Sequence, residues 1–283
     1  MANLKEIRDR IKSVKSIQQV TKAMKMVAAA KLRRAQQNME QSRPYTENLE
    51  NMISSLLPDV DRSMLALLDK RPVKRIAYLI ISSDRGLAGS FNSNVIKKAQ
   101  TEIDEFGKDN VDVFCIGKKV RDHFKKREYN IIEEHIGFWN ELDFSHAIKI
   151  GSGVISKFLS GDVDEIKIVG NLFKNIAVQK TICKTLLPLT FDTVESVNID
   201  RIFEPSKIEL VEALIPRHLN VQVWQALLES YASEMAARMV SMENATTNAD
   251  DMIKSLKLKF NKARQAAITK EILEIVSGAE ALA

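Results

Sequence analysis

Apolar residues recur every three or four positions at both ends of the chain. In the first part the series comprises Leu4, Ile7, Ile11, Val14, Ile17, Val20, Met24, Val27, Ala28, Leu32, Ala35 and Met39. In the last part it comprises Trp224, Leu228, Tyr231, Met235, Met239, Met242, Ala245, Ala249, Met252, Leu256, Phe260, Ala263 and Ala267. Residues 1–43 and 217–277 contain no Gly or Pro, the strongest helix interrupters. The pattern therefore predicts one long helix at each end of the chain.

The apolar stripe on each predicted helix is narrow, which is typical of a coiled coil. Stretches of about 55 and 70 residues would form helices roughly 80 and 100 Å long, well beyond the ~30 Å of a small domain. We therefore expect much of the helix pair to protrude from the rest of the protein. The segment SMENATTNA, residues 241–249, is rich in Ser, Asn and Thr, which are poor helix formers. We expect a partner outside the pair to contact this segment.

The middle of the chain has a different pattern, and nine of the ten glycines lie between Gly86 and Gly170. Short β-branched and apolar runs predict strands at Arg75–Ser83, Val111–Gly117, Glu165–Leu172 and Ala177–Leu189, the last ended by Pro188. Helical segments are predicted at Asn94–Phe106, Lys118–Arg127 and Phe144–Leu159. This alternation predicts a doubly wound sheet of parallel strands.

The expected fold class is α/β plus a long antiparallel α-helical coiled coil. A Rossmann-like α/β domain would be inserted between the N-terminal and C-terminal helices. The predicted boundaries are 1–57 for the N-terminal helix, 72–205 for the α/β domain, and 209–283 for the C-terminal helix that pairs with 1–57.

One loop invites a test for nucleotide binding, because Leu79–Val95 passes from an apolar run through two glycines toward a helix. A P-loop has four residues between its glycines and then Lys-Ser/Thr, and a dinucleotide fingerprint has three glycines. Here two residues separate Gly86 from Gly89, and Ser90-Phe91 follows. A tight turn with Ser90 or Asn92 capping the helix fits better, so the loop is weak support for nucleotide binding.

The charge of the chain allows an anionic partner, which could be nucleic acid, an acidic membrane face or an acidic protein surface. The net charge is +5 and the pI is about 9.0. Residues 1–43 carry eleven Lys or Arg against three acids, and no acid occurs from Met252 to Lys270. If the two helices are antiparallel, these basic segments lie near each other.

No apolar run approaches the ~20 residues of a membrane span. The two cysteines show no metal-ligand pairing or disulfide framework, which predicts a reducing, cytosol-facing environment.

Catalytic motifs are not found in the sequence. The four histidines are scattered, and neither G-x-S-x-G nor H-E-x-x-H occurs. Asp84 and Arg85 end a predicted strand, where catalytic groups often lie in α/β folds, but such a pair more often fixes a loop.

Four long motifs carry a resemblance that spans the chain. They are IQQVTKAMKMVAAAKLRRAQ (Ile17–Gln36), SDRGLAGSFN (Ser83–Asn92), SEMAARMVSMENATTNA (Ser233–Ala249) and NKARQAAITKEILEIVSGAEAL (Asn261–Leu282). In this order they resemble the gamma subunits of bacterial F-type ATP synthases. The family often has Cys and Gly where this chain has Ala88 and Ser90, and Gln where it has Lys270. The cysteine pair of the redox-switched chloroplast relatives is not present.

The resemblance implies a central rotor shaft that couples proton flow through the membrane sector to ATP synthesis, or ATP hydrolysis to the reverse. The implied partners are the alpha and beta subunits of the catalytic ring, the epsilon subunit and the c-subunit ring. The implied location is peripheral, at the cytoplasmic face of the bacterial plasma membrane. No catalytic residue, cofactor or metal in this chain is implied, because the nucleotide sites belong to the ring.

Matching positions with the family suggest which residues touch the ring. Partner contact and coupling are expected of Met24, Lys25, Arg238, Arg264, Gln265, Thr269 and Glu271. Arg264 is expected to meet a beta-subunit carboxylate. Each of these residues has the alternative role of supporting the helix pair.

Two other functions remain as alternatives. A basic coiled-coil protein that binds nucleic acid would repeat phosphate contacts along its helices and preferably stack aromatic residues on bases. Its basic segments have only Phe260 and Tyr45 nearby. A nucleotide-binding α/β enzyme built on Gly86–Asn92 would bind or turn over ATP without partners.

Overall fold

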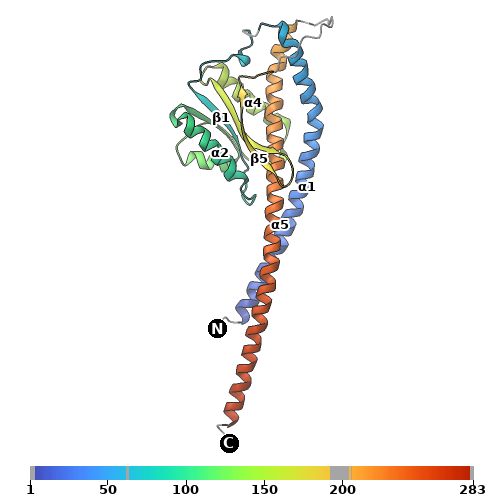
Figure 1. The fold of residues 1–283 in the computed structure, drawn as a ribbon, viewed down its shortest axis with the longest axis vertical. Coiled ribbons are helices and arrows are strands. Elements are labelled where there is room, and N and C mark those ends of the chain that lie inside the picture. The colour runs from blue at the N-terminus through green and yellow to red at the C-terminus, as the bar shows by residue number, and fades with distance from the viewer. Residues whose placement is uncertain (1–3, 62–63, 192–203, 205, 281–283) are drawn as a thin grey trace. The chain divides into compact units, whose positions relative to one another are not determined.

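A computed structural model describes residues 4–61, 64–191, 204 and 206–280. The helices are α1 (Leu4–Leu56), α2 (Phe91–Phe106), α3 (Lys118–Lys125), α4 (Phe144–Leu159) and α5 (Lys207–Glu280), and the strands are β1 (Ile76–Ile81), β2 (Val111–Ile116), β3 (Asn130–His135), β4 (Glu165–Phe173) and β5 (Gln179–Leu187) (Figure 1). The two terminal helices are continuous, as the sequence predicts, with 53 and 74 residues. Each contains a proline, Pro44 in α1 and Pro216 in α5.

The chain divides into two compact units. One is formed by Met1–Ala28 with Met239–Ala283, and the other by Ala29–Arg238. Both α1 and α5 therefore contribute to both units. One long helix can belong to both units because it makes a different set of contacts along each part of its length.

In the unit Ala29–Arg238, the described strands form one sheet in the order β3-β2-β1-β4-β5. Strands β3, β2, β1 and β4 are parallel, and β5 pairs antiparallel with β4. The sequence prediction missed β3. Its residues NIIEEH are exposed or half-buried and include two carboxylates, so they lack the apolar run of a buried strand. A hairpin connects β4 to β5, which explains the antiparallel edge.

Helices cover both faces of the sheet. On one face, α2 and α3 pack through Val95, Ala99, Ile103, Val120 and Phe124. The opposite face packs against α4 and against the parts of α1 and α5 in this unit. Figure 1 shows α2 on one side of the sheet and α4 on the other. Helices on both faces explain why β1 and β2 are buried at every position.

A close contact between two loops fixes the carboxyl ends of the parallel strands. Gly117 follows β2 with a φ of +96°, and a Cβ at this position would collide with the backbone oxygen of Ser82, which follows β1. The amide of Ser82 donates to the carbonyl of Ile116 at 2.7 Å. Only glycine allows this approach without displacing backbone.

We predict that Gly117→Ala lowers the free energy of unfolding by about 3 kcal/mol, because it adds a backbone collision to an unfavourable φ. Gly161→Ala is the control: Gly161 has a φ of +75° with open space around its Cβ position. Its cost should be only ~1 kcal/mol. Urea unfolding of the purified chain measures both, and equal losses would contradict the collision.

A histidine lies in the core beside the sheet. His218 of α5 is 2% exposed, its Nε2 lies 2.8 Å from Nε2 of Gln222, and its ring packs against Phe191. Burial, and to a smaller extent the positive charge of Lys184, lowers the pKa of His218 to about 4. The imidazole is therefore neutral at pH 7.

Acidification should destabilise the fold through His218. Between its ordinary pKa near 6.5 and the folded value of about 4, the unfolded state binds a proton that the folded state does not. The free energy of unfolding therefore falls as pH drops through this window, by up to about 1.4 kcal/mol per pH unit. His218→Gln should give a shallower fall between pH 7 and pH 4 in chemical unfolding, and an unchanged slope would contradict this origin.

Candidate coupling surface

In the unit formed by Met1–Ala28 with Met239–Ala283, α1 and α5 run antiparallel. Polar pairs that join them include Gln18 Nε2 to Asp250 Oδ1 at 3.4 Å, Thr21 Oγ1 to Thr246 Oγ1 at 2.8 Å, and Lys25 Nζ to Glu243 Oε1 at 2.6 Å. Residue numbers rise along α1 as they fall along α5, which defines the direction. Val14 completes the contact by packing on Ala249 and Ile253. The helix pair is thus joined by polar as well as apolar contacts.

The contact face of α1 agrees only in part with the expected apolar stripe, of which Val14 and Ala28 are buried. Ile17, Val20 and Val27 were predicted to face α5, but each is more than half exposed. From Val14 the contact continues through Gln18, Thr21, Lys25 and Ala28. The predicted apolar series continues from Val14 to Ile17, three residues later, whereas the contact continues from Val14 to Gln18, four residues later. The two series therefore lie on neighbouring faces of the same helix. Polar residues can occupy the contact because partners on α5 satisfy them.

Met24 and Lys25 lie at the edge of this contact. Met24 is half-buried, and Lys25 forms its ion pair with Glu243 while 37% of the Lys25 side chain and 53% of the Glu243 side chain remain exposed. An exposed pair of this kind contributes at most ~1 kcal/mol. Beside it is an open groove of about 340 Å³ lined by polar side chains, namely Gln18, Gln19, Lys22, Lys25, Glu243, Thr246 and Thr247. Lys25 can therefore exchange its internal partner for an external one at low cost.

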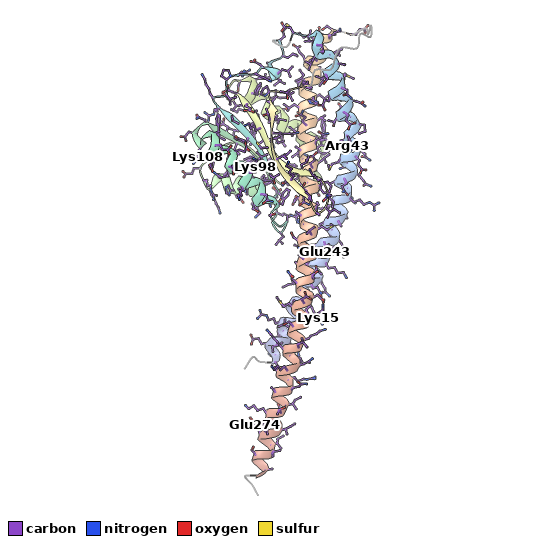
Figure 2. All side chains as sticks on the ribbon, in the orientation of Figure 1. Lys15, Arg43, Lys98, Lys108, Glu243 and Glu274 are labelled. Carbon is purple, nitrogen blue, oxygen red and sulfur yellow. The ribbon has the colours of Figure 1, made fainter. Side chains whose placement is uncertain are left out.

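Further along α5 the helix becomes exposed. Arg8 of α1 lies over the ring of Phe260 at 5.7 Å, and beyond Arg264 the described residues of α5 are exposed on all sides except at Ala267. Figure 2 shows side chains extending from α5 in several directions around Glu274. Exposed apolar residues in this part are Ile268, Ile272, Leu273, Ile275 and Val276, with 48 to 72% of their surface accessible. So much exposed apolar surface is typical of a protein-binding region.

Four of the predicted contact residues lie in this exposed part. Arg264, Gln265, Thr269 and Glu271 are all solvent-accessible. The hydroxyl of Thr269 donates to the carbonyl of Gln265 at 2.9 Å, within the helix. Sequence reasoning selected these polar positions and missed their exposed apolar neighbours. The unequal lengths of the two predicted helices could have revealed them. Arg8, near the start of α1, lies over Phe260, so the later part of α5 has no α1 residues beside it.

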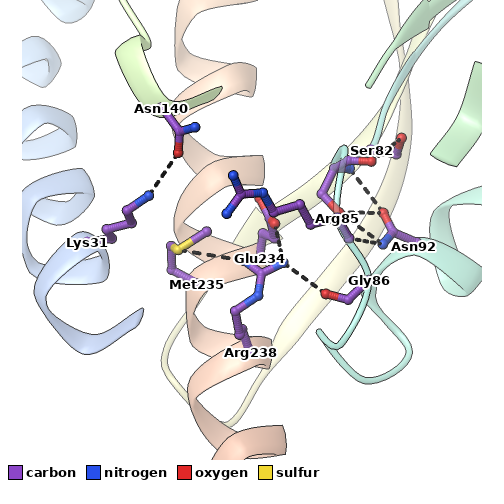
Figure 3. A network of polar contacts seen from close by, with 10 residues as sticks. Lys31, Ser82, Arg85, Gly86, Asn92, Asn140, Glu234, Met235 and Arg238 are labelled. Carbon is purple, nitrogen blue, oxygen red and sulfur yellow. Dashed lines mark hydrogen bonds and ion pairs between the residues drawn. The ribbon is translucent and has the colours of Figure 1, made fainter. Parts of the chain in front are cut away.

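Arg238 has a different environment, inside the unit Ala29–Arg238. Its residue is 9% exposed, and Nη2 lies 2.7 Å from Oε1 of Glu234 and donates to the carbonyl of Gly86 at 3.1 Å. Burial raises the pKa of Glu234, and the charge of Arg238 opposes this shift. Figure 3 shows both side chains of α5 directed toward the Gly86 loop. The i, i+4 spacing of Glu234 and Arg238 was the available sequence signal for this pair.

The Ser83–Asn92 loop is held by its own polar groups. The amide of Ser83 donates to Oδ1 of Asn92 at 3.0 Å, and the Ser83 hydroxyl donates to the carbonyl of Arg85 at 2.6 Å. Asp84 accepts the amides of Lys118 and Gly137, both at 2.8 Å. Asp84 thus fixes loops, as predicted, although through backbone amides. Asn92 holds the loop, and neither it nor Ser90 makes the side-chain cap expected for α2.

This loop lies where doubly wound sheets bind nucleotides, at the carboxyl end of β1 next to the point where strand order reverses. A phosphate cradle presents backbone N–H groups to solvent. In this loop the carbonyl of Gly86 accepts a hydrogen bond from Arg238, and the amide of Ser83 donates to the side chain of Asn92. The Ser83 amide is therefore already used within the protein. The arrangement joins the sheet to α5. Among the described residues, no group of His, Cys, Asp and Glu side chains could hold a metal ion.

Comparisons with known proteins agree along the full chain. Residues 3–282 match the family model described as ATP synthase. The chain is 47% identical to the ATP synthase gamma chain of Prosthecochloris aestuarii and 45% identical to that of Chloroherpeton thalassium, covering 100% of this chain and 99% of each relative.

Solved structures show the same fold at lower identity. The chain is similar to one in the rotor of the Euglena gracilis mitochondrial ATP synthase, with a TM-score of 0.68, 22% identity, and coverage of 94% of this chain and 98% of that one. A second chain, from the OSCP/F1/c-ring structure of the same enzyme, gives a TM-score of 0.70 at 22% identity, with coverage of 99% and 94%.

The terminal helices and the mixed sheet have the fold of these chains. The family match and the full-length relatives define the class, a subunit of an ATP synthase. The chain belongs to the ATP synthase gamma-chain family, and its role is that of a rotor shaft in the ATP synthase.

We predict that Arg238→Met lowers the free energy of unfolding by about 3–5 kcal/mol, because it leaves the Glu234 carboxylate buried without its cation. Adding Glu234→Leu to Arg238→Met removes both charges and should recover part of the loss. Urea unfolding of the full chain measures the two variants. If the double variant is as unstable as the single one, the buried charge is not the cause.

Proposed function

We propose that this chain couples rotation of a membrane ring to changes of nucleotide affinity in a catalytic ring, and that it is not itself catalytic. The observation that carries the proposal is the full-length relationship to gamma chains, together with a helix pair whose last part is exposed. In this proposal α1 and α5 form a coiled coil, and a Rossmann-like α/β domain lies at its base. The segments 1–57, 72–205 and 209–283 would correspond to these parts.

The proposed partners are the alpha and beta subunits around the helix pair, and the epsilon subunit and c-subunit ring at the base. The chain would lie at the cytoplasmic face of the bacterial plasma membrane, held there by the complex. Among the described residues, no helix has the length and hydropathy needed to cross a bilayer. Peripheral attachment through partners is compatible with that finding.

Coupling follows from contacts that differ between orientations of the shaft. If one orientation favours one nucleotide state of a beta subunit, the nucleotide state must equally favour that orientation. A surface that passes three similar partners in turn needs contacts that exchange readily. Lys25 suits this role because its bond to Glu243 is solvated and weak.

The exposed residues of α5 are proposed as the other contacts. Arg264 would pair with a beta-subunit carboxylate, and Gln265, Thr269 and Glu271 would make further polar contacts beside the exposed apolar residues. Met24 would pack beside Lys25. The predicted contact role of Arg238 requires its bonds to Glu234 and Gly86 to open, or the residue acts by holding the loop.

Binding of nucleic acid is the weaker alternative. The basic residues of unit Met1–Ala28 with Met239–Ala283 are compatible with it, but the gamma-chain relatives do not support it. DNA affinity that falls steeply with salt would be its signature.

We predict that the double variant Lys25→Glu, Arg264→Glu lowers proton-driven ATP synthesis about tenfold, equivalent to ~1.4 kcal/mol of coupling. Assembly with the catalytic ring should persist, because many other contacts remain. ATP synthesis in membrane vesicles and subunit content after purification are the two measurements. Full synthesis activity would contradict a contact role for these side chains.

Two controls separate partner contact from internal pairing. Lys25→Glu combined with Glu243→Lys restores an ion pair between α1 and α5, so a defect that persists in this swap arises outside the chain. Lys125→Glu with Lys126→Glu makes the same charge change on exposed residues of the α/β domain and should leave synthesis unchanged.

A further inference from the structure

Two loops at one edge of the sheet contact the terminal helices inside the unit Ala29–Arg238. One is the Ser83–Asn92 loop, which follows β1, and the other is residues 136–143, which follow β3. Strands β1, β2 and β3 are parallel, so both loops lie at the carboxyl edge of the sheet. In other doubly wound sheets this edge binds ligands. Here it contacts helices of the same chain.

Each loop makes an oriented contact with α5. The carbonyl of Gly86 accepts a hydrogen bond from Arg238 at 3.1 Å. In the second loop, the ring of Trp139 lies parallel to the ring of Tyr231, with 4° between their planes and 6.0 Å between their centroids. Two separate loops therefore hold α5 through groups whose relative orientation matters.

The contacted residues form one stripe along α5. Tyr231, Glu234 and Arg238 are spaced by three and four positions, so they lie on one side of the helix. Their side chains extend outward from the helix axis, so turning α5 about its axis would displace all of them at once. Apolar packing is non-directional and opposes such a turn less than hydrogen bonds do. The stripe therefore opposes rotation of α5 against the sheet.

The helix α1 is tied to the same edge. Lys31 Nζ donates to Oδ1 of Asn140, in the second loop, at 3.0 Å (Figure 3). Lys31 and Arg238 lie near the two ends of this unit, which begins at Ala29 and ends at Arg238. Each terminal helix thus bonds to the carboxyl edge of the sheet close to the point where it leaves the unit.

The carboxylate of Asp84 connects the loops to each other. Its Oδ1 accepts the amide of Lys118, which begins α3 after β2, and its Oδ2 accepts the amide of Gly137 after β3, both at 2.8 Å. One side chain therefore joins the segments that follow β1, β2 and β3. The first loop also holds Leu87 at a φ of +62° with its side chain exposed. Such a conformation persists only where the surrounding contacts fix the backbone.

We propose that Asp84 and the two loops form a torsional clamp, which fixes the rotation angle of α5 relative to the sheet and passes torque between the α/β domain and the helix pair. Asp84 acts through the loops, so it is a positioning residue. This inference rests on the proposed function, because torque passes through the chain only if the chain turns inside a ring.

The test measures the torsional stiffness of the assembled complex. The catalytic ring is fixed to a surface, and a bead on the α/β domain reports its angle during a nucleotide-bound pause. The bead is attached through Lys108→Cys, an exposed position, with Cys183→Ser in every variant to avoid a second attachment. Asp84→Ala should increase the variance of the bead angle about twofold, because the loops lose the bonds that hold them together.

Asp164→Ala is the matched control. Asp164 is half-buried like Asp84, and it also accepts two backbone amides, from Lys74 at 2.7 Å and Arg75 at 3.0 Å. These bonds lie before β1, at the opposite edge of the sheet. Both variants should lose similar stability in urea unfolding, but Asp164→Ala should leave the bead variance unchanged. Equal variances for the two variants would overturn the clamp.

Failure of the clamp and failure of the proposed function give different results. If the unaltered complex does not rotate during ATP hydrolysis, the proposed function is wrong. If it rotates and Asp84→Ala leaves the variance unchanged, only the clamp is wrong. Should Asp84→Ala not assemble, Asp84→Asn replaces it, since this variant keeps one acceptor oxygen. Its variance must also exceed that of Asp164→Ala, and an equal value would overturn the proposal.

Discussion

The continuous helix α5 is the constraint on which the rest of the structure depends, because one backbone must meet several environments in succession. Val211, Leu219 and Leu227 are buried in the core with the sheet. Ala249 and Ile253 then pack against α1, and beyond Arg264 nearly every residue is exposed. An α-helix satisfies its own backbone groups, so it can pass from core to solvent without a break. The side chains of α5 therefore determine whether each part of the helix packs in the core, pairs with α1 or stays exposed.

Two kinds of electrostatic contact divide accordingly. Within the unit Ala29–Arg238, the Glu234–Arg238 pair is buried, and Arg238 also donates to the Gly86 carbonyl. Loss of either residue would leave the other charge buried without its partner. In the other unit the Lys25–Glu243 pair is solvated and contributes little to stability. The first kind suits a fixed joint between sheet and helix, and the second suits a surface that changes partners.

The sequence predicted the long helices and most of the sheet because Gly, Pro and apolar periodicity act locally. Strand β3 was missed since its Glu133, Glu134 and His135 look like a surface segment, and its pairing with β2 comes from distant residues. The contact face of α1 was misassigned in part, because Thr21 and Lys25 are polar. Their suitability depends on Thr246 and Glu243, more than 200 residues away. The resemblance selected the exposed polar residues of α5, but burial of Arg238 requires the Gly86 loop to be placed in three dimensions.

The polar pairs of Thr21 with Thr246 and Lys25 with Glu243 also determine how the two helices align along their length. Small apolar residues such as Ala28 would tolerate a shift of one helical turn, about 5.4 Å, with little loss. The same shift would separate hydroxyl from hydroxyl and ammonium from carboxylate, and it would leave the buried Thr21 with only the carbonyl of Gln18 in its own helix. These weak bonds therefore specify the register of the two helices. They oppose sliding of one helix along the other while adding little to the stability of the pair.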